Sequence, residues 1–219
     1  MATHVSFDPL ARHYDWLENM TAGPRLERMR AVGLDALQGR RRILSMGEGH
    51  GRFAAACMAR YPGAELTCVD ASERMLARAR RRVEAALARG GSRRPLITWQ
   101  CADALAWSSE QEFDAVVTCF FLDCFPATAL EQVIGRITKS AARDALWVNV
   151  DFAVPARGWK RWRAEAIHRL MYAFFRAAVK LPARKWTAPD QLLTAQGFQL
   201  ATRSESEWGL LRTDVWRRP

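Results

Sequence analysis

The sequence lacks the features of a membrane-spanning or exported chain. It contains no uninterrupted apolar run of about 18 residues, the length at which a transmembrane helix becomes the expected structure. Its N-terminal stretch, MATHVSFDPLARHYDW, does not show the basic, apolar and small-residue regions of a secretory signal. Fixed-period repeats and low-complexity tracts are missing as well, which excludes solenoid architectures. We therefore expect a cytoplasmic protein.

Cysteine is scarce and scattered. The five cysteines are an odd number, and they form neither a Cys-x-x-Cys pair nor a cluster with histidine. Most lie in apolar stretches, so we interpret them as buried, reduced thiols that behave as small hydrophobic side chains, and we expect neither a metal site nor a redox site. They are Cys57, Cys68, Cys101, Cys119 and Cys124.

What the chain has in excess is positive charge. With 219 residues, 49% of them hydrophobic and 26% charged, it has the composition of one soluble globular domain with a well-buried core. Its 33 lysines and arginines outnumber 23 acidic residues, which gives a net charge of +10 and an isoelectric point near 10.1. This balance favours an anionic partner, which would be a membrane surface, a nucleic acid or an acidic small molecule.

Short apolar segments alternate along the chain with longer segments of helical periodicity. Such alternation indicates βαβ units, whose right-handed crossovers give a parallel sheet covered by helices on both faces. We expect one or two helices before the sheet, a short helical segment after residue 101 and a long helix at 157–180. The expected strands are 41–46, 64–70, 95–101, 113–119 and 144–152, followed by an antiparallel hairpin of 197–205 and 209–217. The helices expected between strands are 50–60, 72–88 with Ser72 as its cap, and 126–139.

The segment 43–51, ILSMGEGHG, carries the strongest functional signal. A buried strand runs into three alternating glycines, and a helix begins directly after them. Glycines in such a loop tolerate positive φ and let the backbone approach a ligand beside a helix N-terminus. The second strand ends in Asp70, whose carboxylate can bond both hydroxyls of a ribose, and the third ends near Asp103, where an adenine amino group could be read.

These motifs, with Phe113-Asp114 at the start of the fourth strand, resemble those of the class I S-adenosylmethionine-dependent methyltransferases in order and spacing over residues 41–125. The resemblance implies a Rossmann-like α/β fold with a seven-stranded, mostly parallel sheet and an antiparallel C-terminal hairpin. It implies S-adenosyl-L-methionine as cofactor and S-adenosyl-L-homocysteine as product. It divides a single domain, 1–219, into an N-terminal helical lid (1–40), a cofactor-binding core (41–152), a helical segment that covers the acceptor (153–190) and a closing hairpin (191–219).

The same resemblance implies a set of cofactor-binding residues that surround the methionine part, the ribose, the adenine and the sulfonium. In that order, they are Gly47, Gly49 and Gly51; Asp70; Asp103, Ala104 and Met75; and Cys119 and Phe120, with Glu48 and Ala71 completing the set.

One position departs from the family pattern. The residue two before the first glycine is commonly acidic, whereas here it is Ser45, and an acid stands between the glycines as Glu48. In one interpretation Glu48, or its carbonyl, takes over the contact with the cofactor's ammonium group. In the other, Glu48 is an exposed charge that precedes the helix.

A nicotinamide or flavin enzyme is the alternative nucleotide-binding class, but its GxGxxG pattern is not met, because position 52 is Arg52.

The N-terminal segment 7–15, FDPLARHYD, resembles the lid helix of ubiquinone/menaquinone-type and other small-molecule methyltransferases. By that resemblance Tyr14 would close over the cofactor. The alternative is an aromatic side chain that packs one helix onto the sheet.

Methyl transfer is an in-line displacement from a sulfonium, so the protein mainly aligns the nucleophile and excludes water. A general base is needed only where the acceptor must lose a proton. The candidates follow the fourth and fifth strands or lie in flanking helices, and they are His13, Asp123, Asn149, Asp151 and His168. No catalytic dyad is evident from the sequence.

The segment 157–180 is the main indication of the substrate. At helical spacing its apolar residues form one stripe, and a mostly basic face lies opposite. Three interpretations remain open: the stripe packs on the domain while the basic face meets water, the helix docks on an anionic membrane, or it contacts nucleic acid. The stripe is Trp162, Ala166, Leu170, Phe174, Ala177 and Ala178; the basic face is Arg161, Glu165, Arg169, Tyr172, Arg176 and Lys180.

The sequence thus predicts an enzyme that methylates a small acceptor of hydrophobic or lipid-like character, cytoplasmic or peripheral to the inner face of the membrane. The segments FFLDCF and GLLRTDVWRR resemble a group of bacterial methyltransferases, which supports the class but indicates no acceptor. The alternatives are a nucleic-acid methyltransferase and a non-catalytic binding protein of methyltransferase fold, the latter favoured only by Ser45.

Overall fold

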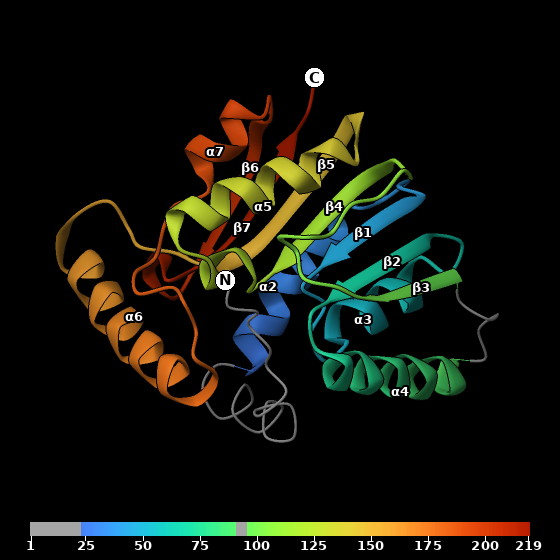
Figure 1. The fold of residues 1–219 in the computed structure, drawn as a ribbon, viewed down its shortest axis with the longest axis horizontal. Coiled ribbons are helices and arrows are strands. Elements are labelled where there is room, and N and C mark those ends of the chain that lie inside the picture. The colour runs from blue at the N-terminus through green and yellow to red at the C-terminus, as the bar shows by residue number, and fades with distance from the viewer. Residues whose placement is uncertain (1–22, 91–95) are drawn as a thin grey trace.

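A seven-stranded sheet runs through the centre of the protein in the order β3-β2-β1-β4-β5-β7-β6 (Figure 1). The computed structural model describes residues 23–90 and 96–219. The strands are β1 (Arg42–Met46), β2 (Glu65–Asp70), β3 (Leu96–Cys101), β4 (Phe113–Cys119), β5 (Ala141–Phe152), β6 (Gln199–Ser206) and β7 (Leu211–Arg217). The helices are α2 (Gly23–Asp35), α3 (Arg52–Arg60), α4 (Glu73–Gly90), α5 (Ala127–Lys139), α6 (Gly158–Val179) and α7 (Asp190–Ala195), with short 3₁₀ turns η1 (Leu122–Cys124) and η2 (Glu207–Gly209).

The first five strands are parallel, and the strand order reverses at β1. The chain adds β2 and β3 on one side of β1, then returns to add β4 and β5 on the other. In open α/β sheets a crevice for ligands forms at such a reversal, outside the carboxyl ends of the strands. The fold therefore places a binding site between the loops that follow β1 and β4.

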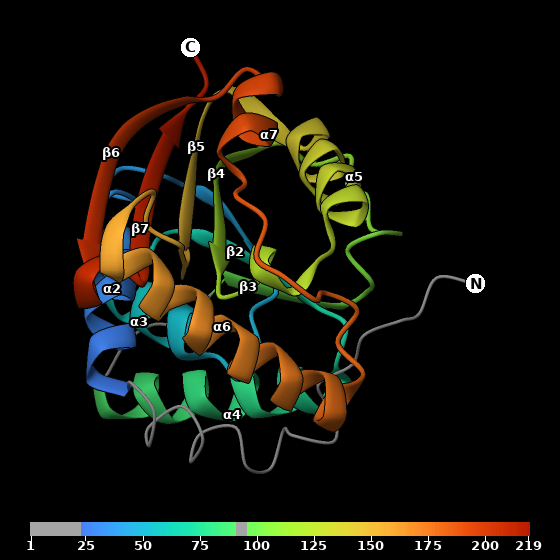
Figure 2. The ribbon, with the colours of Figure 1, turned by 90° about the vertical axis from the view of Figure 1, so that its left-hand side faces the viewer.

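Two hydrophobic cores cover the two faces of the sheet, as the views in Figure 1 and Figure 2 show. Helices α2, α3 and α4 pack on one face, with Leu26, Phe53 and Val83 among their buried residues. Helices α5 and α7 pack on the other through residues such as Ile134 and Leu193. The inner strands β1, β2, β4 and β5 are largely buried on both faces and appear in the sequence as mostly apolar runs, whereas the edge strands β3 and β6 are mostly exposed or half-buried.

The antiparallel end of the sheet is held by an ion-pair network. The buried Asp214 on β7 pairs with Arg203 and Arg212, at 2.8 Å each. Both arginines also reach Asp190, the first residue of α7. This network ties α7 to the closing hairpin.

Most of the expected elements form with boundaries shifted by one to three residues, and Ser72 caps α4 by accepting a hydrogen bond from the Met75 amide at 3.1 Å. Two expectations are wrong in detail. The segment after β3 is a turn, not a short helix, in which the Asp103 carbonyl accepts from the amides of Ala106 and Trp107. Helix α7 forms inside a stretch for which no helix was expected. A third expectation is wrong in part: Cys57 and Cys68 are buried, but Cys119 and Cys124 are only partly buried and Cys101 is exposed.

Helix α6 stands to one side of the sheet (Figure 2) and packs through the opposite face from the one its stripe suggests. The residues buried against the domain are Ala164, His168, Tyr172 and Val179. Trp162 and Leu170 of the apolar stripe are each 75% exposed. The interpretation in which the stripe packs on the domain is therefore wrong. Among the described residues, no helix is both long and apolar enough to cross a bilayer.

Candidate active site

A cavity of about 310 Å³ opens at the carboxyl ends of the parallel strands β1 to β4. The loops after these strands supply most of its wall. Gly51 does not line it, and His13 and Tyr14 lie outside the described residues. The other cofactor-site residues expected from the sequence all line the cavity: Gly47, Glu48, Gly49, Asp70, Ala71, Met75, Asp103, Ala104, Cys119 and Phe120.

The glycine loop has a different role at each glycine. All three have left-handed φ, of 70° at Gly47, 65° at Gly49 and 87° at Gly51. A Cβ at Gly47 would lie 2.1 Å from the ring of Phe121, whereas one at Gly49 would meet nothing within 4 Å. A Cβ at Gly51 would lie 2.4 Å from the backbone of Ala79 in α4. Gly49 is therefore open to a ligand, and Gly51 allows α3 and α4 to pack closely.

We expect Gly51→Ala to lower the free energy of unfolding by about 2 kcal/mol or more, because the change combines positive-φ strain with a collision against backbone. Denaturant titration measures the loss. Gly63→Ala is the matched control, since Gly63 lies in a turn, has no positive φ and leaves open space for a Cβ. Equal stability of the two variants would contradict the packing role of Gly51.

Asp70, the last residue of β2, fixes the glycine loop from across the cavity. One carboxylate oxygen accepts from the Gly49 amide at 2.8 Å, and the other accepts from the Ser72 amide at 2.8 Å. A carboxylate offers about four acceptor positions, so each oxygen can accept a further hydrogen bond from a ligand hydroxyl. The third-strand acid Asp103 is held in the same way by the Leu105 amide, at 2.9 Å.

Glu48 is buried in the cavity wall and is not an exposed charge, so the second interpretation of this residue is wrong. Its carboxylate accepts from the Ser45 hydroxyl at 2.5 Å and from the Ala54 amide at 2.9 Å, in the first turn of α3. A carboxylate from three residues further on therefore reaches the Ser45 side chain, the position at which the family pattern led us to expect an acid. The pKa of Glu48 is raised from its usual 4.5 to about 7, chiefly by burial and to a smaller extent by the charge of Asp70, while Ser45, Ala54 and Arg30 oppose the rise.

Three basic or titratable residues on the wall could not be expected from the motifs. Arg30 of α2 is buried, and its guanidinium lies 5.0 Å from the centroid of the Phe120 ring. Arg52 donates to His50 Nε2 at 2.9 Å and pairs with Glu27 at 2.7 Å. Arg30 also pairs with Glu27, at 3.2 Å, so Glu27 partly neutralises both guanidinium groups, which are the groups of this wall suited to face a carboxylate.

Comparison with known proteins agrees with this geometry. A family model described as a methyltransferase domain matches residues 43–144. The chain is 35% identical to a demethylmenaquinone methyltransferase of Thermus thermophilus over 155 residues, which cover 69% of this chain and 66% of the relative. It is 28% identical to a trans-aconitate 2-methyltransferase of Methylobacterium radiotolerans over 211 residues, which cover 93% of this chain and 69% of the relative. The chain belongs to the class I S-adenosylmethionine-dependent methyltransferases.

Solved methyltransferase structures share the fold. The N-methyltransferase NodS of Bradyrhizobium japonicum, in complex with S-adenosyl-L-homocysteine, superimposes with a TM-score of 0.62 at 19% identity, covering 90% of this chain and 86% of its own. An O-methyltransferase family protein of Burkholderia thailandensis gives a TM-score of 0.73 at 15% identity, over 95% of this chain and 59% of its own. The chain spans about two thirds of the length of the two curated relatives.

S-adenosylmethionine is the cofactor of this methyltransferase, and the cavity suits it. Its volume falls at the lower end of the roughly 300–1,000 Å³ of small-molecule sites. Open backbone at Gly49 and the Asp70 carboxylate provide polar contacts, while Met75 and Ala104 supply apolar surface for a flat base. Bound there, the cofactor supplies an activated methyl group on sulfur.

Asp123 and Asp151, two of the expected general bases, lie behind the methyltransferase cavity and do not line it. Both are buried, and an oxygen of Asp151 accepts from the Asp123 amide at 3.3 Å. Burial raises the pKa of Asp123 to about 6; burial and the neighbouring Asp123 raise the pKa of Asp151. Cys124 lines the cavity wall, and its thiol lies 3.5 Å from Asp123 Oδ1. Cys124 therefore lies between the two acids and the cavity.

Asn149 and His168 are also absent from the cavity wall. Asn149 accepts from the buried hydroxyl of Thr118 at 2.8 Å, which is a structural contact within the sheet. His168 lies on the buried face of α6, where its Nδ1 contacts the Ala164 carbonyl at 2.8 Å and burial lowers its pKa. Of the candidate bases that the structure describes, none is placed to take a proton from an acceptor inside this cavity.

Proposed function

We propose that this methyltransferase transfers the methyl group of S-adenosylmethionine to a small hydrophobic acceptor. The observation that carries the proposal is the apolar wall beyond Phe120. Phe121 and Phe125 form an edge-to-face pair with centroids 5.0 Å apart, and Pro182, from the segment after α6, completes that side. An acceptor without charge would lose little hydration there and would gain burial.

The cofactor would occupy the inner part of the cavity. Gly47 and Gly49 would follow its methionine part, with Arg30 or Arg52 facing the carboxylate and Glu48 facing the ammonium group. Asp70 would accept from the ribose hydroxyls. Asp103, Ala104 and Met75 would enclose the adenine, which leaves the sulfonium beside Cys119 and Phe120.

In the proposed reaction a lone pair or carbanion of the acceptor forms a bond to the methyl carbon, and the carbon–sulfur bond breaks. Its electron pair stays on sulfur, which becomes the neutral thioether of S-adenosylhomocysteine. None of the described candidate bases named from the sequence lines the cavity, and His50, which does line it, already accepts a hydrogen bond from Arg52 at its Nε2. The chain's contribution is therefore alignment and exclusion of water, and an acceptor proton would leave to solvent. Acceptors that ionise readily, such as reduced quinones and phenols, fit this chemistry.

The two curated relatives favour different acceptors. One is named for demethylmenaquinone and the other for trans-aconitate. The aromatic and proline residues at the cavity mouth support the first kind of chemistry over a multiply charged acid.

Transfer of labelled methyl groups to a panel of acceptors tests the proposal. We expect turnover with reduced naphthoquinones or alkylated phenols, and little with tricarboxylates or RNA. Phe125→Ser should raise KM for the hydrophobic acceptor about tenfold, the loss expected for removing one buried aromatic contact, and leave cofactor affinity within about twofold. Leu200→Ser, at an exposed position on β6, is the matched control. Preferential methylation of RNA, or cofactor binding without transfer to any member of the panel, would reject the proposal.

A further inference from the structure

The outward face of α6 is apolar. Trp159, Trp162, Leu170 and Phe174 are 60%, 75%, 75% and 45% exposed, and they recur at helical spacing along five turns of the helix. The residues between them on this face are small, since Ala166, Ala173 and Ala177 are also exposed. Scattered surface hydrophobic residues need no explanation, but a continuous stripe of large ones marks an interaction site.

The stripe continues beyond the helix. Trp208, in the link between β6 and β7, is 57% exposed, and its ring centroid lies 5.9 Å from that of Trp159. Arg163 stacks on Trp208 at 4.7 Å and donates to the Glu207 carbonyl at 3.2 Å, which fixes the start of α6 to this link. Two elements that are far apart in sequence thus present one apolar surface.

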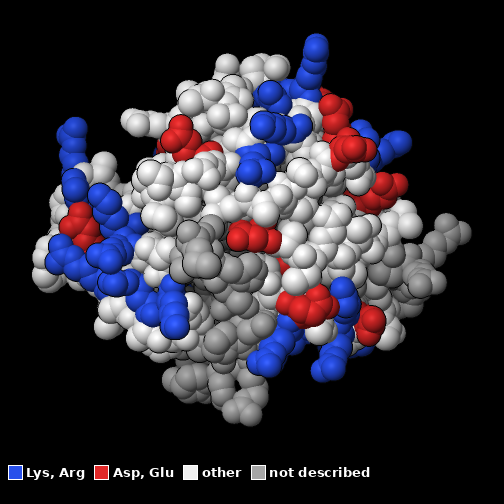
Figure 3. Space-filling model, in the orientation of Figure 1, with Lys and Arg blue, Asp and Glu red and all other residues white. Residues whose placement is uncertain are grey.

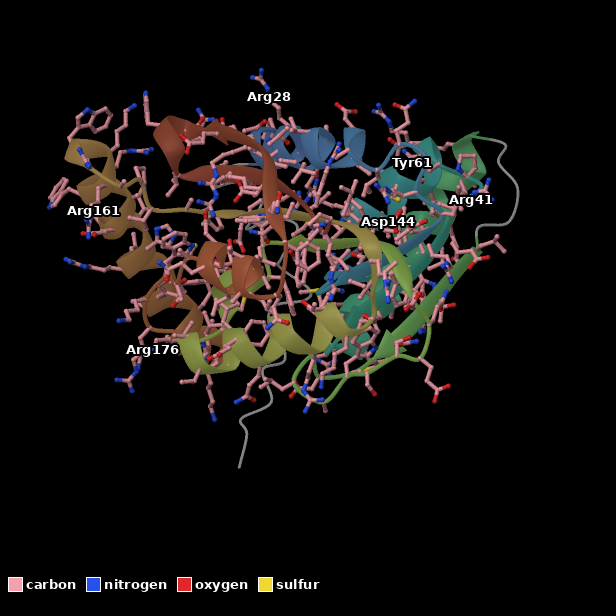
Figure 4. All side chains as sticks on the ribbon, turned by 90° about the horizontal axis from the view of Figure 1, so that it is seen from above. Arg28, Arg41, Tyr61, Asp144, Arg161 and Arg176 are labelled. Carbon is pink, nitrogen blue, oxygen red and sulfur yellow. The ribbon has the colours of Figure 1, made fainter. Side chains whose placement is uncertain are left out.

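Basic side chains border this surface. Figure 3 shows them gathered over the edge of the molecule where α6 lies, and Figure 4 shows Arg161 and Arg176 along that edge. A cleft of about 520 Å³ between α6 and residues 184–186 is lined by Arg161, Arg169, Arg184 and Lys185. Its single acidic residue, Glu165, is already paired with Arg161 at 2.8 Å. The cleft therefore carries a net positive charge that suits phosphate groups.

We propose that α6 lies in the interface of an anionic lipid bilayer, with its apolar stripe in the headgroup–acyl boundary and the exposed basic side chains beside the stripe, Arg169 and Arg176, on lipid phosphates. An amphipathic helix with tryptophan and leucine on one side and arginine and lysine beside it binds in this manner. The net charge of +10 adds long-range attraction to such a surface. The segment after α6 contributes Pro182 to the cavity wall, so docking of α6 would hold the acceptor site near the membrane.

The combination of charge and apolar surface argues against two other occupants. A second copy of the chain would meet the same surface across a two-fold axis, and would bring two sets of the basic side chains beside the stripe together. A nucleic acid would neutralise the arginines but would leave Leu170 and Phe174 in water. A bilayer satisfies both the charge and the apolar stripe.

Sedimentation of the full chain with lipid vesicles, without cofactor, tests this proposal independently of methyl transfer. We expect binding to vesicles of mixed phosphatidylglycerol and phosphatidylcholine, weaker binding to phosphatidylcholine alone, and a decline with added salt. Trp162→Ser with Leu170→Ser should weaken binding at least about tenfold, since both side chains lose burial in lipid. Leu96→Ser, at a 56% exposed position on β3, is the matched control and should change nothing.

Charge reversal gives a second comparison. Arg169→Glu with Arg176→Glu should weaken binding to the anionic vesicles at least about tenfold, because two cationic side chains that would face anionic lipid become anionic. Arg136→Glu with Lys139→Glu makes the same change on exposed positions of α5 and should have a much smaller effect. The proposal is overturned if the anionic vesicles fail to sediment the chain, if the α6 variants bind like the wild type, or if these variants abolish instead a self-association or an RNA complex.

Discussion

Asp70→Ala is expected to weaken the binding of S-adenosylmethionine and S-adenosylhomocysteine at least about 100-fold. Two hydrogen bonds from ribose hydroxyls to a carboxylate would each contribute about 1.5–3 kcal/mol, and both are lost. The glycine loop also loses its anchor, because the amides of Gly49 and Ser72 no longer have an acceptor at 2.8 Å. Titration calorimetry of both ligands measures the effect.

Asp114 offers a matched control for this experiment. It also accepts from two backbone amides, those of Arg41 at 2.9 Å and Arg42 at 3.0 Å, but it lies at the amino end of β4, away from the cavity. Asp114→Ala should lower stability without changing cofactor affinity more than about twofold, since no ligand contact is removed. Wild-type affinity in Asp70→Ala would show that the cofactor does not bind through this carboxylate.

The central sheet could be predicted from the sequence because its inner strands are largely buried on both faces. Runs such as 64–70 and 113–119 are mostly apolar and are flanked by polar residues, so they can be recognised as strands without tertiary information. The glycine loop was predictable for a related reason. A positive φ at three alternating positions is tolerated by glycine and by few other residues, and it therefore leaves a mark in the sequence.

The orientation of α6 could not be predicted in this way. Periodicity identifies an apolar stripe but not the element that covers it, and here no described element does. The helix is instead oriented by contacts of its other face, among them the hydrogen bond from the Tyr172 hydroxyl to the Asp123 carbonyl at 3.0 Å. That contact joins residues 49 positions apart, and a local pattern carries no information about it.

The same limit applies to the site. Arg30 reaches the cavity from α2, a helix that precedes the glycine motif, and only the packing of α2 on the sheet brings it there. The candidate bases Asp123 and Asp151 follow the expected strands, yet their side chains turn into the interior behind Cys124. Position along a strand predicts which end of the sheet a residue occupies, but not whether it points into the cavity.

Glu48→Gln is expected to stabilise the fold above pH 7 while weakening cofactor binding. A pKa raised from 4.5 to about 7 means that the native protein holds a proton that the unfolded chain releases at lower pH. The free energy of unfolding therefore falls as pH rises between these values, and the full cost of about 3 kcal/mol is present above pH 7. Glutamine removes the charge and can keep both contacts, accepting from the Ala54 amide and donating to Ser45. We expect a gain of about 1–3 kcal/mol at pH 8 and little change near pH 4.

Cofactor binding gives a second test of the ionisation of Glu48. A cationic ammonium group near Glu48 would favour the ionised carboxylate, so binding at pH 7 should release up to about half a proton, and affinity should rise with pH through this range. In Glu48→Gln the proton release should disappear and affinity should fall about tenfold, while the exposed Glu84→Gln should behave like the wild type. Calorimetry in buffers of different ionisation enthalpy counts the protons. Unchanged proton release on cofactor binding to Glu48→Gln would assign the released proton to another group. A lower free energy of unfolding of Glu48→Gln than of the wild type at pH 8 would show that Glu48 is ionised in the native protein and that its hydrogen bonds and neighbouring charges compensate the cost of burial.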